Sequence, residues 1–72
     1  MPNANIIGER LRKLRGDRDR AVVADAVGIS TSALSMYEIG QRVPRDEIKM
    51  KLASYYGKTV EDIFYAPDGH EM

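Results

Sequence analysis

The sequence contains no cysteine and no tryptophan, and it has only one histidine and one phenylalanine. The absence of cysteine excludes disulfides and cysteine-based zinc sites. No apolar run is long enough for a transmembrane helix or for the core of a signal peptide, so we expect a cytoplasmic protein without a membrane partner. The single histidine, His70, follows a Pro/Asp/Gly-rich stretch near the chain end, where a general base is poorly held. We therefore expect no enzyme: no catalytic residue, no metal and no cofactor.

The chain has 72 residues, of which 43% are hydrophobic and 31% are charged. This composition is typical of one small folded domain rather than of a disordered chain. A chain of this size buries only about 60% of the surface that it exposes when unfolded, so association with a partner would stabilise it. We expect the domain to occupy residues 1–66, and residues 67–72 to form a frayed tail.

The formal net charge is zero, but the charges are segregated along the chain. Residues 1–20 carry +3, residues 21–40 carry −2, residues 41–56 carry +2 and residues 57–72 carry −3. If the two basic segments fold side by side, they form one positive face. The alternative is that these charges are ordinary solvated helix surface, and charge alone does not decide between the two.

Apolar residues recur at helical spacing nearly throughout the chain, and no strand pattern appears, so we expect an all-α fold. The first helix is predicted near residues 5–15, where Ile7, Leu11 and Leu14 form the apolar stripe. Asp19 and Ser30 are expected to cap the second and third helices, which end near Gly28 and Gly40. A fourth helix begins at Pro44 and Asp46 and ends at Gly57; a fifth follows, with a capping box formed by Thr59 and Asp62, and stops at Pro67.

The third predicted helix has an unusual outward face. At 100° per residue, one arc of about 140° holds Thr31, Ser32, Ser35 and Met36. The opposite arc, which we expect to face the core, holds Ala33, Leu34 and Tyr37. Exposed helix faces normally carry Lys and Glu, so an uncharged face indicates that something docks there.

The second and third helices fit the spacing of a helix-turn-helix. Ala24 is the small residue where the two helices cross, and Gly28 is the turn glycine. The positions that must be apolar hold Val23, Val27, Ile29, Leu34 and Tyr37. Two short helices locked at a steep angle by one apolar cluster leave the second helix free to enter a major groove.

Four segments together carry a family resemblance: IGERLRKLRG, VVADAVGISTSALSMYEIGQRVP, LASYYG and TVEDIF. They resemble the phage-repressor/Cro-type (XRE-like) family of helix-turn-helix transcriptional regulators, over about residues 6–65. The resemblance implies a compact five-helix lambda-repressor-like domain that binds double-stranded DNA sequence-specifically, most often as a repressor.

The resemblance also implies roles for particular residues. Base contacts fall on Thr31, Ser32, Ser35 and Met36, and backbone contacts on Arg20, Arg42 and, less directly, Arg45. Arg15 is expected to pair with Glu38, although the short loop 16–19 leaves Lys13 as an alternative partner. The chain departs from the family at Ile39, which replaces a polar residue, and at Ala21 and Val22, which replace glutamates on an exposed side.

Two functional questions remain open at this stage. One domain reads few base pairs, so we expect a homodimer on a palindromic operator, with recognition helices about 34 Å apart. Ile63, Phe64 and Tyr65 are the candidate dimer interface, with Ile63 inward and Phe64 or Tyr65 toward the partner copy. The alternative function is an antitoxin or accessory module that binds a regulatory partner protein through the same domain.

Overall fold

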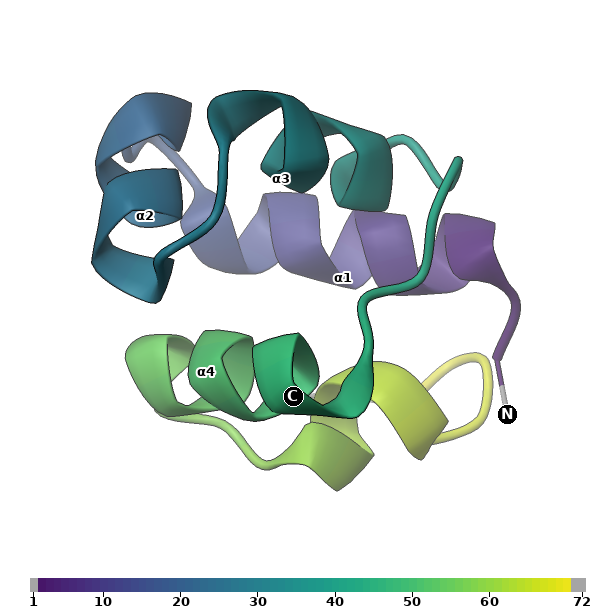
Figure 1. Ribbon diagram of the computed structural model, residues 1–72. Helices are drawn as coiled ribbons and strands as arrows, with labels where there is room; N and C mark the ends of the chain where they lie inside the picture. Colours follow the sequence, from purple (N-terminus) through teal and green to yellow (C-terminus); the bar gives the residue numbers. More distant parts are fainter. Residues whose placement is uncertain (1, 71–72) are drawn as a thin grey trace.

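The computed structural model describes residues 2–70, which form five helices and no strand (Figure 1). The helices are α1 (Ala4–Arg15), α2 (Arg20–Val27), α3 (Thr31–Glu38), α4 (Asp46–Tyr56) and the short η1 (Glu61–Tyr65). In Figure 1, α3 lies above α1, α2 lies at its left end, and α4 and η1 lie below it. The predicted all-α, five-helix fold is confirmed.

One apolar core joins all five helices. The side chains of Ile7 and Leu11 from α1 are fully buried, together with Val23, Leu34, Leu52, Ile63 and Phe64 from the other four helices. Burying a side chain of this size stabilises the fold by about 1.5–3 kcal/mol, so this cluster is the main favourable contribution. Helix α1 packs against both α3 and η1, and α2 packs against α4, so both sets of contacts connect the upper and lower parts of the molecule.

The predicted capping residues begin their helices as expected. The Asp19 carboxylate accepts a hydrogen bond from Ala21 N at 2.8 Å, and the Ser30 hydroxyl accepts one from Ala33 N at 3.0 Å. The capping box is also confirmed: Asp62 N donates to Thr59 Oγ1 at 3.0 Å, and Thr59 N donates to Asp62 Oδ2 at 3.3 Å. These side chains satisfy backbone donors that a helix start leaves without a partner.

The fifth helix differs in type from the expected α-helix. Glu61–Tyr65 form a π-helical turn, closed by a hydrogen bond from Ala66 N to Glu61 O at 2.7 Å. Of the three candidate interface residues, Ile63 and Phe64 are completely buried, and Tyr65 is exposed, at 40%. The expectation that Phe64 is available to a partner copy is therefore wrong. The ring fits inside because η1 packs against α1 on one side, while Lys49 of α4 lies over the ring at 5.7 Å from its centroid.

Helix α1 passes very close to the C-terminal end of α3. A Cβ atom placed on Gly8 would overlap Glu38 O and would come within 2.9 Å of Tyr37 O. Because the obstacles are backbone atoms, they cannot rotate away, and only glycine allows this approach. Gly8 therefore fixes how α3 sits on the rest of the domain.

The chain after η1 is held in part by side chains of the domain. Arg10 donates to Pro67 O at 2.7 Å, and His70 Nε2 lies 3.0 Å from Asp62 Oδ1. The predicted frayed tail begins at residue 67, and its last two residues, 71–72, lie outside the described part of the chain. No helix within residues 2–70 has the length and apolar character needed to cross a membrane.

Candidate nucleic-acid interface

The helix-turn-helix is formed by α2, the turn at Gly28 and α3. Gly28 has φ 84°, a left-handed conformation, and both Gly28 N and Ile29 N donate to Ala24 O at 2.9 Å. This closes α2 and turns the chain within three residues, which requires glycine at the turn. The predicted apolar positions Val23, Val27, Leu34 and Tyr37 are all buried between the helices.

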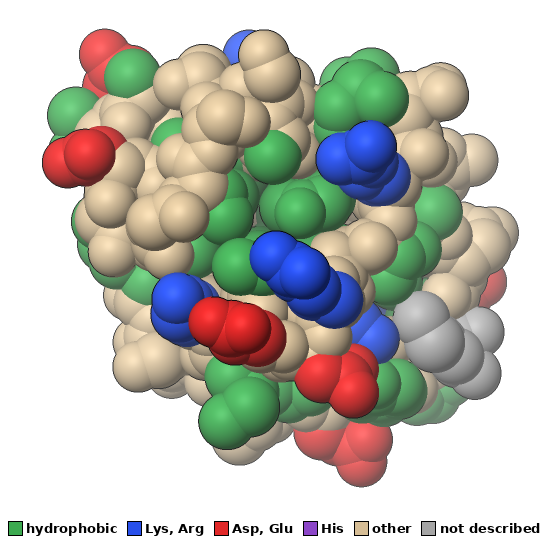
Figure 2. All heavy atoms as spheres, in the orientation of Figure 1, with side chains coloured by type: hydrophobic (Ala, Val, Ile, Leu, Met, Phe, Trp, Pro, Cys, Tyr) green, Lys and Arg blue, Asp and Glu red, His purple; other side chains and the backbone are tan. Residues whose placement is uncertain are grey.

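The outward face of α3 carries the four residues proposed as base contacts. Thr31 and Ser32 are exposed, while Ser35 and Met36 are partly buried. The surface over α3 is largely free of charged side chains (Figure 2). Hydroxyl groups can donate to or accept from base edges, and a methionine side chain can pack on a thymine methyl group. The structure thus brings these four side chains to one face, and their contact with bases stays a prediction.

Basic side chains lie beside this face. Arg42 and Arg45 are exposed in the linker between α3 and α4, and Arg20 begins α2. In Figure 2, blue Lys and Arg side chains are visible around and below the position of α3. Cations at such positions suit the phosphate groups that flank a major groove. Arg20 comes from the first basic segment of the sequence and Arg42 and Arg45 from the second, and their forming one positive face stays a prediction.

A buried carboxylate connects α3 to the two preceding helices. Glu38 is fully buried, and it accepts hydrogen bonds from Arg15 Nε at 2.8 Å and from Arg15 Nη2 at 3.1 Å. Arg15 is thus the partner expected from the sequence, and Lys13, the alternative, is exposed. The hydrogen bond to Glu38 raises the pKa of the Arg15 guanidinium. Arg12 also donates to the main-chain oxygen of Glu38.

Arg20 takes part in this network, which sequence reasoning did not predict. Its Nε donates to Glu38 Oε1 at 3.3 Å, and its side chain remains 42% exposed. The Glu38 carboxylate thus binds both Arg15, which has a structural role, and Arg20, which lies at the proposed DNA surface. The pairing fixes the direction of the Arg20 guanidinium, because Nε is committed to Glu38.

Two buried cations were also missed by the sequence analysis. Arg10 donates to the carbonyls of Ile63, Ala66 and Pro67 at 2.7–3.1 Å, and Lys49 donates to Tyr65 Oη at 3.0 Å. Arg10 binds carbonyls at the C-terminal end of η1, where a cation is favoured. The sequence did contain a signal that Arg10 is buried, because Arg10 lies three residues after Ile7 and four before Leu14, on the apolar stripe of α1.

Comparison with known proteins gives the family. The family model described as a helix-turn-helix domain matches residues 6–63. No curated protein matches the chain significantly. The P22 c2 repressor, crystallised in complex with a synthetic operator, superposes with a TM-score of 0.81 at 23% identity, covering 86% of this chain and 97% of the repressor chain.

Two further solved structures have the same fold. The restriction-modification controller protein C.AhdI from Aeromonas hydrophila gives a TM-score of 0.77 at 27% identity, covering 85% of this chain and 96% of its own. The SOS-response transcriptional repressor LexA from Eubacterium rectale gives a TM-score of 0.85 at 18% identity, covering 97% of this chain and 76% of its own. With the helix-turn-helix geometry and the family match over most of its length, the chain belongs to the phage-repressor type of the helix-turn-helix domain family.

Proposed function

We propose that this helix-turn-helix regulator binds double-stranded DNA sequence-specifically in the cytoplasm and represses transcription by occupying an operator. The observation that carries the proposal is the uncharged outward face of α3, with the half-exposed Arg20 at the start of α2 and the exposed Arg42 and Arg45 in the α3–α4 linker. The P22 c2 repressor, which shares the fold, was crystallised with an operator, and this supports DNA as the ligand.

In this proposal the uncharged side chains of α3 and the nearby arginines have different roles. Thr31, Ser32, Ser35 and Met36 meet base edges in the major groove and set the preferred sequence. Arg20, Arg42 and Arg45 meet phosphates and set affinity and orientation without reading sequence. Glu38 contributes indirectly, because it holds α3 against α1 and directs Arg20.

A single domain of this size reads too few base pairs to define an operator, so we propose a homodimer on a palindrome. With Phe64 and Ile63 in the core, Tyr65 is the one of the three candidate interface residues that can meet the partner copy. The proposed interface is therefore the surface around Tyr65.

Selection of bound duplexes from a random DNA pool tests the function. We expect enrichment of one sequence with two inverted half-sites whose centres are separated by about 34 Å, one helical turn. Binding without enrichment of any sequence would contradict sequence-specific recognition. Enrichment of a single half-site would contradict the dimer but not the DNA-binding function.

Substitutions distinguish the residues that select a DNA sequence from the residues that bind the DNA backbone. Ser32→Ala or Met36→Ala should cost about 1–3 kcal/mol on the selected duplex and less on random DNA. Arg42→Ala and Arg20→Ala should weaken binding to all duplexes alike and lower the magnitude of the salt slope by about one each. Equal losses on both kinds of DNA for the α3 variants would show that this face does not read bases.

The dimer interface is tested by sedimentation. Tyr65→Ala should shift the protein toward a folded monomer that still binds a half-site weakly, because Tyr65 is largely outside the core. A variant that remains dimeric would exclude the fifth helix as the interface. Phe64 is unsuitable for this test, since its replacement would unfold the core.

A further inference from the structure

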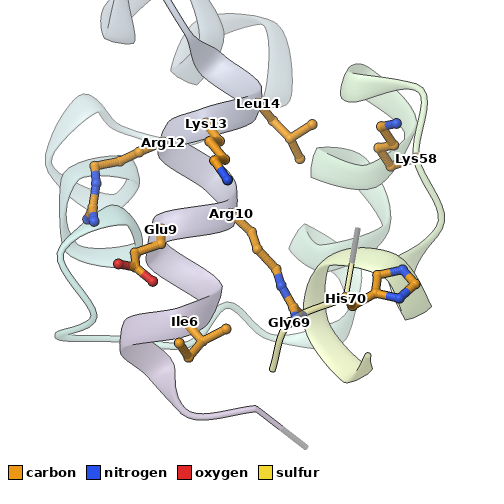
Figure 3. A pocket seen from close by; sticks show the side chains of 9 residues that line it. All are labelled: Ile6, Glu9, Arg10, Arg12, Lys13, Leu14, Lys58, Gly69 and His70. Carbon is orange, nitrogen blue, oxygen red and sulfur yellow. The ribbon is translucent and has the colours of Figure 1, made fainter. Parts of the chain in front are cut away.

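A groove runs along the side of α1 that faces the C-terminal segment (Figure 3). It encloses about 970 Å³ and is lined by α1 residues from Ile6 to Leu14, by Lys58 after α4, and by Gly69 and His70. No residue of α2 or α3 contributes to it. The groove is therefore built from elements other than the helix-turn-helix.

The groove is strongly cationic. Four basic side chains line it, Arg10, Arg12, Lys13 and Lys58, against the single carboxylate of Glu9, which gives a net charge of +3 with His70 neutral. The whole chain is neutral, so this concentration of charge is local. Such a surface attracts a negatively charged partner and accelerates its association.

Arg10, the buried basic residue of the groove, is unusual in its hydrogen-bond partners. Arg10 is only 6% exposed, and its guanidinium contacts three carbonyl oxygens but no carboxylate of residues 2–70. Its charge is thus balanced by dipoles alone within the described chain. A carboxylate in the groove would be stabilised by this buried charge and by the more exposed Lys13, which lies one turn further along α1 (Figure 3).

The groove also has an apolar component. The side chains of Ile6 and Leu14 are partly buried and line it between the cations. Small-molecule sites bury most of their ligand, whereas this groove is partly open to solvent. An open channel beside a helix of about 18 Å suits an extended segment of about six residues.

We propose that this groove binds an acidic, amphipathic peptide segment of a partner protein. Glutamates or aspartates of the segment pair with Lys13 and Lys58, and an apolar residue between them packs on Ile6 and Leu14, while Arg12 remains bound to the main-chain oxygen of Glu38. A DNA phosphate backbone fits less well, because Glu9 and the two apolar side chains lie in its path. The inference does not depend on DNA binding by α3, since the two surfaces share no residue.

The probe is a fluorescein-labelled peptide of about eight residues with alternating glutamate and leucine, titrated with the full chain by fluorescence anisotropy. We expect it to bind at least about tenfold more tightly than the same peptide with glutamine in place of glutamate. Amide chemical shifts should change in α1 and at residues 69–70. A glutamine peptide of equal affinity would overturn the proposal.

Charge reversal locates the site. Lys13→Glu and Lys58→Glu should each weaken binding of the glutamate peptide about five- to tenfold. Lys51→Glu is the matched control, because Lys51 is an exposed lysine of α4 outside the groove, and it should change the affinity less than twofold. An equal effect of the control, or unchanged binding by both groove variants, would overturn the site.

Duplex DNA is the competing occupant. Lys13→Glu should leave the affinity for the selected duplex, and its salt slope, within experimental error of the parent protein. If Lys13→Glu weakens DNA binding as much as peptide binding, the groove is a DNA contact and the peptide proposal is wrong. If the chain binds the peptide but no DNA, the groove proposal stands and the function proposed for α3 fails.

Discussion

Replacing Glu38 with alanine tests how the recognition helix is held. The carboxylate is completely buried and accepts two hydrogen bonds from Arg15 and one from Arg20. Removing it leaves two guanidinium groups facing each other at the end of α3 without their shared anion. The substitution also removes buried methylene groups, which leaves a small cavity next to the backbone of α1.

The magnitude follows from the exposure of the partners. Removing one member of a well-buried ion pair costs about 3–5 kcal/mol of unfolding free energy. The side chain of Arg15 is 16% exposed and that of Arg20 is 42% exposed, so both recover part of their hydration. We therefore expect the lower end of the range, about 3 kcal/mol, which lowers the Tm of a domain of this size by about 12–24 °C.

Urea unfolding followed by circular dichroism measures this cost. Arg20→Ala is the matched control, because it removes one half-exposed partner and should cost under about 1 kcal/mol. Arg15→Ala should lie between the control and Glu38→Ala, since Arg20 then remains beside the carboxylate. An unfolding curve for Glu38→Ala within about 0.5 kcal/mol of the parent, or a larger loss for Arg20→Ala, would refute this reasoning.

Three further predictions concern single residues. Gly8→Ala should lower stability by about 1–3 kcal/mol in urea unfolding, because the new Cβ meets the backbone of α3; an unchanged midpoint would disprove the close contact. Burial raises the pKa of Tyr56 to about 12, above the value of about 10 in the unfolded chain, so stability should fall as pH rises from about 10 to about 12. Tyr56→Phe should remove the late phenolate signal in ultraviolet titration and flatten this alkaline loss. The hydrogen bond from His70, followed by those from Thr59, lowers the pKa of Asp62, so its contribution to stability should be present above pH about 4 and be lost below; Asp62→Asn should flatten that acid dependence.

Much of the fold follows from local rules that the sequence displays directly. Asp19, Ser30 and the Thr59–Asp62 pair act within three residues of their partners, so their capping roles could be predicted without knowledge of the tertiary structure. The same holds for the turn at Gly28. The apolar spacing of α2 and α3 likewise predicted which side of the recognition helix faces outward.

The features that were missed depend on contacts distant in sequence. Arg10 reaches carbonyls more than 50 residues away, and a charge on an apolar stripe does not reveal its acceptor. The requirement for Gly8 arises only once α3 lies on α1. Phe64 or Tyr65 was assigned to a partner copy because one short helix was not expected to bury three consecutive apolar residues, whereas the π-helical turn buries Ile63 and Phe64 and leaves Tyr65 exposed.

The most direct test of sequence-specific DNA binding is the ratio of two dissociation constants at physiological salt: that for a random duplex and that for the best selected duplex. We predict a ratio of about a thousand or more for the parent protein. Replacing the side chains of Thr31, Ser32, Ser35 and Met36 with alanine should reduce this ratio strongly while random-duplex binding persists. A parent ratio near one, or a ratio that these four replacements leave unchanged, would contradict recognition through α3.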